Sequence, residues 1–282
     1  RRAWIVVGET ARSQSKNTSR GLVRAAASLV VTSVLATSVQ AGPSGGQVTA
    51  GDGVISQVGN TTNINQSSQN LAVNWQSFNV DAQESVNFVQ PSTTALAINR
   101  ILDTNGSKVM GNINANGQVI LVNPNGILFG QNAQVNVGAL VATALDLTNN
   151  QLNSGKLTFS GDGTGSIVNQ GQLNASQGGH IALIGNQVSN EGTINTPQGT
   201  AALAAGNQVN LTFANNNLIQ LKVEQSVLNS QASNGGMIKA DGGIVLLSAG
   251  AKNALLASVV NNTGVIEALS FENQGGEIVL LA

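Results

Sequence analysis

The carboxylates are the residues that could support acid–base catalysis, and their spacing offers no pair. A site that cleaves a glycosidic bond needs two carboxylates, or a carboxylate and a base, that face one groove. Beyond residue 41 the carboxylates are scattered, and no two fall at the same position of neighbouring 21-residue repeats. The set comprises Asp52, Asp81, Glu84, Asp103, Asp146, Asp162, Glu191, Glu224, Asp241, Glu267, Glu272 and Glu277. The sequence therefore predicts that the chain is not an enzyme.

Nucleophilic, metal and phosphate chemistry find no better support. The chain has no cysteine and one histidine, His180, so it lacks thiolate nucleophiles, and its histidine has no evident triad or ligand partners. The residue 21 positions after His180 is Ala201, which favours an exposed or edge position for the imidazole. The segment Gly161–Gly165 (GDGTG) is not followed by a helix pattern, which argues against a phosphate loop. We expect no cofactor and no metal.

The composition is that of a long β-structure with a neutral surface. Of 282 residues, 41% are hydrophobic, 9% are charged, 3% are aromatic and 33 are glycine. Without residues 1–41 the chain keeps six basic and twelve acidic side chains, a net charge of −6. A nucleic-acid partner requires a basic face, so the charge pattern disfavours it.

The first 41 residues have the features of an extended signal peptide. Arg20 and Arg24 precede a short apolar run, Ala25–Thr37, and Val39-Gln40-Ala41 is a small-residue cleavage site. Cleavage is expected between Ala41 and Gly42, by signal peptidase after export through the Sec machinery. We therefore divide the chain into residues 1–41, which are removed, and residues 42–282, the secreted domain.

A repeat sets the expected architecture. Ile167–Gln187 is followed directly by Val188–Gln208 with matching Asn and Gly positions, a period of 21 residues. Each repeat holds strands of four or five residues separated by Gly or Asn-Gly corners, too short for a crossover helix. Such strands can run parallel only if the chain coils. The pattern therefore predicts an all-β fold, a parallel β-helix or solenoid.

The repeat also indicates how the coils are packed. The residues expected to point inward are Ile167, Leu173, Ile181, Leu183 and Val188. Asn at repeated corners is expected to form amide ladders between coils. Residues 42–282 would give about 11 coils of 21 residues, with the irregular segment Gly42–Arg100 as an N-terminal cap over the exposed strand edge. The apolar strand Ile278–Ala282 has no stop signal, so further coils are expected after it.

Three ordered motifs resemble the haemagglutination-activity, or two-partner secretion, family. They are Asn74–Val80 (NWQSFNV), Ala97–Ile101 (AINRI) and Ile113–Ile127 (INANGQVILVNPNGI). The resemblance covers nearly all of Gly42–Ala282. It is nearest to the high-molecular-weight non-pilus adhesins, because a second Asn-Pro-Asn-Leu motif of the filamentous haemagglutinin branch is missing. It implies a right-handed β-helix that crosses the periplasm and then leaves through a dedicated outer-membrane barrel.

The resemblance also implies which residues serve export. Asn99, Arg100 and Asn123-Pro124-Asn125-Gly126 are candidates for recognition by the periplasmic domains and barrel of the transporter. The alternative for Asn123–Gly126 is a corner that only sets strand register, because Pro and Asn-Gly are turn residues. Trp75 and Phe78 are expected to pack within the cap.

The predicted function is secretion targeting and nucleation of folding for a large bacterial exoprotein found at the cell surface or released. Two alternatives stay open at this point: the domain could itself be an adhesin that binds a host or bacterial receptor, or the full-length protein could be a contact-dependent toxin. A role in haem acquisition is a further possibility for the full-length protein. A glycan-degrading β-helix would require converging carboxylates.

Overall fold

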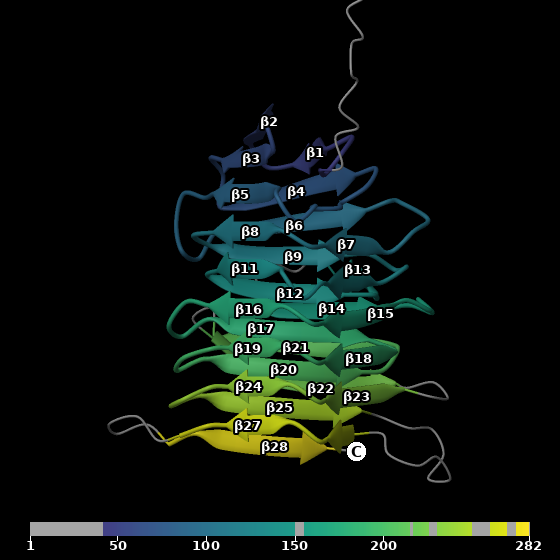
Figure 1. Ribbon diagram of the computed structural model, residues 1–282, viewed down its shortest axis with the longest axis vertical. Helices are drawn as coiled ribbons and strands as arrows, with labels where there is room; N and C mark the ends of the chain where they lie inside the picture. Colours follow the sequence, from purple (N-terminus) through teal and green to yellow (C-terminus); the bar gives the residue numbers. More distant parts are fainter. Residues whose placement is uncertain are drawn as a thin grey trace, which may run out of the picture. The chain divides into compact units, whose positions relative to one another are not determined.

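The computed structural model describes residues 42–149, 155–214, 217–225, 230–249, 260–269 and 275–281. Every helix or strand in these ranges is a β-strand, and the strands form three sheets along one stack together with a fourth sheet beside it (Figure 1). Across the described ranges, no helix has the length and apolar character needed to cross a membrane. The predicted all-β class is confirmed.

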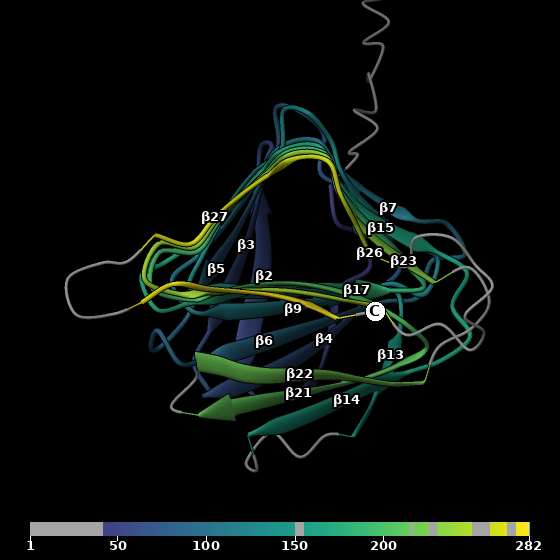
Figure 2. The same ribbon diagram turned by 90° about the horizontal axis from the view of Figure 1, so that it is seen from below.

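Three sheets wind around a common core as a right-handed parallel β-helix, and seen along the stack they enclose a triangular cross-section (Figure 2). The first sheet holds, in spatial order, β1 (Gln47–Ala50), β4 (Asn70–Trp75), β6 (Leu96–Ile101), β9 (Gln118–Val122), β12 (Ala139–Thr143), β17 (His180–Gly185), β20 (Thr200–Ala205), β25 (Ile244–Ala249) and β28 (Glu277–Leu281).

The second and third sheets complete each coil. The second holds β2 (Gly53–Val58), β3 (Thr61–Gln66), β5 (Ser85–Val89), β8 (Asn112–Ala115), β11 (Gln134–Val137), β16 (Gln172–Ala175), β19 (Thr193–Asn195), β24 (Met237–Lys239) and β27 (Val265–Glu267). The third holds β7 (Ser107–Val109), β10 (Ile127–Phe129), β15 (Ser166–Asn169), β18 (Gln187–Asn190), β23 (Gln231–Asn234) and β26 (Val260–Asn262).

The predicted period is the register of the stack. Ile167 lies opposite Val188 on β15 and β18, and Leu173 lies opposite Ile194 on β16 and β19. Alternate residues of each strand point inward, so equivalent positions of successive coils build continuous apolar rows. The five residues expected to point inward are all buried in one core: Ile167, Leu173, Ile181, Leu183 and Val188.

Asparagine ladders accompany these rows, as the sequence predicts. Inside the stack, Asn169 donates to Asn190 over 2.7 Å, Asn190 donates to Asn234 over 2.7 Å, and Asn234 donates to Asn262 over 2.8 Å. A second ladder runs along the outer face of the second sheet, where each amide bonds to the coil before it. Its members are Asn63, Asn87, Asn114, Asn136 and Asn174. The chain thus satisfies its amides along the stacking direction.

Two antiparallel strands cap the N-terminal end. β1 runs antiparallel to β4 and β2 runs antiparallel to β3, whereas the strands that follow in the first and second sheets are parallel to their neighbours. Trp75 and Phe78 lie beneath this cap with their rings edge to face, at a centroid distance of 5.5 Å and an interplanar angle of 81°. Antiparallel strands cover the edge that the first parallel coil would otherwise expose.

A fourth, extra-helical sheet lies outside the first sheet (Figure 2). It consists of the antiparallel strands β13 (Asp146–Asn149), β14 (Lys156–Ser160), β21 (Gln208–Ala214) and β22 (Asn217–Gln225). The sequence analysis treated Gln208 and Val209 as the start of another coil, and this was wrong. The strand after β18 in the third sheet is β23, so residues 208–225 form a hairpin inserted between coils.

The inserted hairpins also explain why the expected number of coils was too high. The described part of the first sheet has nine strands, of which β1 is the cap, which leaves eight parallel coils instead of about eleven. The residues that the 21-residue count assigned to further coils are used in the cap and in the extra-helical sheet.

Candidate functional site at the Asn-Pro-Asn-Gly corner

Asn123–Gly126 forms a tight turn between β9 and β10. The Gly126 N–H donates to the carbonyl of Asn123 over 2.9 Å, and the Asn125 N–H donates to Asn123 Oδ1 over 3.0 Å. Gly126 has a φ of +97°, which favours glycine, whereas Asn125 is not among the residues with positive φ. Because a type II turn needs positive φ at its third residue, the corner is not of that type.

The Asn123 side chain connects neighbouring coils from a fully buried position. Its exposed fraction is 0%, and its amide donates to the carbonyl of Asn105 over 3.1 Å and to Ser107 Oγ over 3.0 Å. Its backbone N–H donates to the carbonyl of Thr143, on the next coil. Asn123 therefore sets register across three coils and is inaccessible to a partner of the folded domain.

Backbone packs closely against the corner on both sides. A Cβ added to Gly165 would lie 2.1 Å from the Gly126 nitrogen, and one added to Gly106 would lie 2.9 Å from the carbonyl oxygen of Asn125. Glycine is required at these neighbouring positions because the coils approach backbone to backbone. The register interpretation of Asn123–Gly126 thus has direct structural support.

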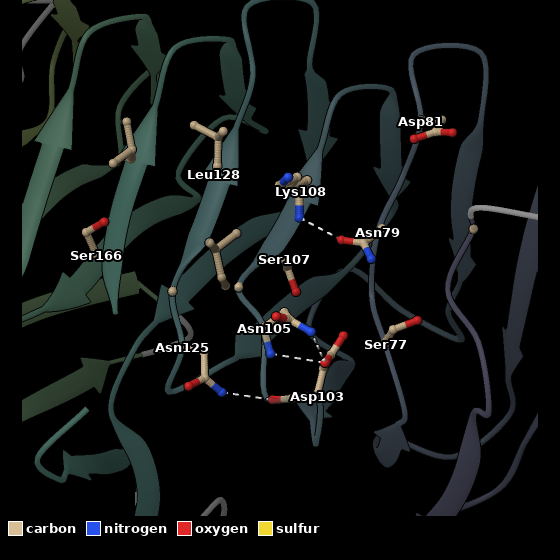
Figure 3. A pocket seen from close by; sticks show the side chains of 15 residues that line it. Ser77, Asn79, Asp81, Asp103, Asn105, Ser107, Lys108, Asn125, Leu128 and Ser166 are labelled. Carbon is tan, nitrogen blue, oxygen red and sulfur yellow. Dashed lines mark hydrogen bonds between the residues drawn. The ribbon is translucent and has the colours of Figure 1, made fainter. Parts of the chain in front are cut away.

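Pro124 and Asn125 are the parts of the corner that reach solvent. Asn125 is exposed, and its Nδ2 donates to the carbonyl of Asp103 over 2.8 Å. It lies on the rim of an open groove of about 710 Å³ over the third sheet, whose labelled side chains are drawn in Figure 3. Polar lining residues include Asn79, Asp81, Asp103, Asn105 and Lys108, and Leu128 and Val168 contribute apolar surface. A partner of the folded domain would meet the corner here.

Asn99 and Arg100 point to opposite faces of β6. Asn99 is inside the stack, where its Oδ1 accepts the indole N–H of Trp75 over 2.9 Å. Arg100 points outward and forms an ion pair with Asp146 at 3.1 Å, at the start of the extra-helical sheet. Asn99 thus positions the cap tryptophan, whereas Arg100 connects an early coil to β13.

The predicted cleavage site lies at the edge of what the structure describes. Ala41 falls outside the described residues, as does the rest of the predicted signal peptide, residues 1–41. Gly42 is the first described residue and is buried near the side chains of Gln57, Thr62 and Glu84.

The expectation that His180 is exposed was wrong, because its exposed fraction is 1%. The imidazole lies on the outer face of the first sheet, 5.0 Å between ring centroids from Phe213 of the extra-helical sheet. The alignment at a constant 21 residues hid this, since His180 pairs with Thr200 and not with Ala201.

One residue is gained or lost at the turn before β17 and β20. Gln198, with φ +54°, occupies the left-handed position that Gly178 (φ +76°) and Gly242 (φ +70°) occupy in neighbouring coils. The three turns carry the same backbone hydrogen bond, closed by Gly179, Gly199 and Gly243. The offset between these two coils is therefore 21 residues before the turn and 20 after it.

The described residues bring together no converging set of chemical groups. No cluster of three or more His, Cys, Asp or Glu side chains that could hold a metal ion is found within the described ranges. The ion pairs of Lys239 with Asp241 and Glu267 lie on the outer surface of the last coils. What the fold builds in this part of the chain is a scaffold, namely a capped right-handed β-helix with an extra-helical sheet.

Comparison with known proteins identifies which scaffold this is. A family model described as the TPS secretion domain matches residues 39–282. The chain therefore belongs to the two-partner secretion domain family, as the motifs from Asn74 to Ile127 implied, and it is a secretion domain.

Individual relatives agree with this assignment. Two heme/hemopexin-binding proteins of Haemophilus influenzae are 34% identical over 250 residues and 35% identical over 240 residues, which are 85% and 78% of this chain. The chain spans 27% and 26% of the length of these relatives. The solved HMW1 secretion domain from Haemophilus influenzae is 30% identical with a TM-score of 0.76, covering 85% of this chain and 62% of that chain.

Proposed function

We propose that residues 42–282 target a large exoprotein to a cognate outer-membrane transporter and nucleate its folding outside the cell. The observation that carries this proposal is the membership of the secretion domain family over residues 39–282. Signal peptidase would cut between Ala41 and Gly42 after Sec export. The chain would then reach the periplasmic domains of the transporter, pass through its barrel, and become a cell-surface or released protein.

The stacked coils suit folding during passage through a pore. In the three sheets each parallel strand pairs with strands of the coils directly before and after it, so a newly exported coil finds its template already folded. The absence of cysteine from the whole sequence leaves no disulfide to obstruct a narrow channel. Folding that proceeds coil by coil would draw the chain outward.

Recognition by the transporter is assigned to the extended chain for the buried part of the motif. Asn99 and Asn123 have exposed fractions of 0% once folded, so a partner could read them only before the coils close. An extended stretch of alternating apolar and polar residues can bind by strand addition to a sheet edge in the transporter's periplasmic domains. In the folded domain only Pro124, Asn125 and Arg100 of the candidate residues are accessible.

The test compares two neighbouring asparagines in cells that express the transporter. Asn123→Ala removes the hydrogen bonds that set register, whereas Asn125→Ala removes an exposed amide from the same corner. Surface appearance should depend on the transporter and should fail for Asn123→Ala, and also for a variant in which Trp75 and Phe78 are both alanine. Normal secretion of the Asn123 and Trp75/Phe78 variants, or secretion of the wild-type chain without a transporter, would contradict the proposal.

The comparison between Asn123 and Asn125 also separates the two roles of the corner. Loss of secretion with Asn125→Ala, when the purified variant melts like the wild type, would indicate contact with a partner through the folded corner. Loss with Asn123→Ala alone would indicate that strand register is what matters.

For the full-length protein, the relatives favour haem or hemopexin binding as a candidate activity. Both are heme/hemopexin-binding proteins, and the matched part is about a quarter of their length. Because that part is the secretion domain, the ligand would be bound elsewhere in the protein. Binding of haem and of hemopexin by the full-length protein, with residues 42–282 alone as the control, tests this; failure to bind favours the adhesin or toxin alternatives.

A further inference from the structure

The middle strands of the first sheet are apolar on both faces. The outer face of β9, β12, β17 and β20 carries Ile120, Val141, Ala182 and Ala202, each buried to at least 99%. A coil needs only its inner face to be apolar, so the outer apolar row exists for the extra-helical sheet. The side chains that cover this row from the extra-helical sheet include Leu157, Phe159, Val209 and Leu211.

The two hairpins of the extra-helical sheet come from either side of two complete coils. β13 and β14 precede residues 166–205, which form the coils β15–β17 and β18–β20, and β21 and β22 follow them. The hairpins meet at β14 and β21, where Phe159 lies opposite Val209 and Leu157 lies opposite Leu211. This is a long-range pairing beside a stack whose sheets pair only neighbouring coils.

Each hairpin is also tied to the coils. On the first hairpin, Asp146 pairs with Arg100 of β6, and Arg100 also donates to the carbonyl of Leu147 over 3.4 Å. On the second hairpin, Phe213 stacks against His180 of β17. The closed sheet therefore connects coils from β6 to β20.

Export from the N-terminus toward the C-terminus gives these contacts an order. When β14 leaves the transporter, its edge facing β21 has no partner until residues 161–207 have followed. The coils β15–β20 form first and are held only by their neighbours. Pairing of β21 with β14 then covers their outer face in a single step.

We propose that the extra-helical sheet is a late-closing retention element, which prevents exported coils from unstacking and sliding back into the transporter. This inference rests on the proposed export function. Before closure, loss of one coil exposes only the inner core. After closure, it also requires separation of β14 from β21 and exposure of the second core.

Leu211 and Thr212 provide a matched pair for the test. They are adjacent on β21, but Leu211 points into the second core and Thr212 points outward. In the purified folded chain, Leu211→Ala should raise the rate of proteolytic cleavage within the extra-helical sheet by at least about 30-fold, from the usual cost of removing a buried leucine. The fluorescence of Trp75 in the cap should stay unchanged, and Thr212→Ala should behave like the wild type.

Export is then measured in cells with the transporter, as the fraction of chains that becomes accessible at the surface over time. We expect Leu211→Ala to reach the surface more slowly and to accumulate in the periplasm, whereas Thr212→Ala follows the wild type. Should Leu211→Ala also disturb Trp75, the milder Leu211→Val takes its place in both assays.

The outcomes separate the two proposals. Unchanged export of a variant whose extra-helical sheet is open would overturn the retention role and leave the secretion function intact. Unchanged cleavage in Leu211→Ala would overturn it as well, because the sheet would then not depend on its apolar contacts. Export of the wild type without a transporter would instead contradict the proposed function.

Discussion

Asn190 is the central link of the internal asparagine ladder, and its replacement by alanine tests how much the ladder stabilises the stack. The side chain has an exposed fraction of 0%, accepts from Asn169 and donates to Asn234, each over 2.7 Å. Asn190→Ala leaves Asn234 Oδ1 buried without this donor and opens a small cavity. One unsatisfied buried group costs about 1–3 kcal/mol, so with the cavity we expect a loss of about 3 kcal/mol.

Scanning calorimetry of the purified chain measures this loss. In a domain of this size a loss of about 3 kcal/mol lowers Tm by about 6–12 °C. The control is Asn174→Ala on the outer ladder, where Asn174 donates to Asn136 over 3.1 Å but is partly exposed. Water can replace that bond, so we expect a change below about 1 kcal/mol. Equal Tm values for the two variants would refute the reasoning that burial gives the internal ladder its strength.

Three further substitutions test local features. Gln198→Gly should raise the free energy of unfolding in urea by up to about 1 kcal/mol, because a side chain is strained at φ +54°. Arg100→Met should cost less than about 1 kcal/mol, and less still in high salt, because Arg100 and Asp146 are 38% and 50% exposed; a larger loss in urea would contradict this. The hydrogen bond and charge of Asp241 raise the pKa of Lys239 above its ordinary 10.5. This pair therefore stabilises the last coils below pH 10.5 and ceases to do so as the pH rises through the raised pKa, so urea midpoints from about pH 9 to about pH 12 should fall less for Lys239→Met.

The coil stack could be predicted from the sequence because its physical cause is periodic. Stacked coils place equivalent residues above one another, so the apolar rows and the Asn169/Asn190 ladder recur in the sequence at the same interval as in space. The cap and the turn at Asn123–Gly126 were likewise accessible from residue types that favour corners.

The extra-helical sheet was missed because its second hairpin begins like another repeat. Gly206 does stack on Gly185, through a hydrogen bond of 2.9 Å, but the chain leaves the coil directly afterwards. A signal was present in β17 and β20, whose residues are apolar without alternation and are all buried. A strand with two apolar faces needs a cover on each, and this argument would also have placed His180 under one.

The accessibility of the candidate recognition residues could not be read from the sequence. Asn99 and Arg100 are neighbours in the chain, yet one is inside the stack and the other is paired with Asp146. Which of two adjacent residues points inward depends on strand register, and a shift of one residue reverses the answer.

The position of the extra-helical sheet limits how such a domain can change its length over evolution. A whole coil duplicated or deleted outside the interval between β14 and β21 lengthens or shortens the stack and leaves that pairing untouched. Inside the interval, deletion of one coil would displace β21 from β14 by one strand spacing, about 4.8 Å, and would disrupt the Phe159/Val209 register. Natural variation in coil number should therefore be found on either side of this two-coil interval, with the interval itself kept constant.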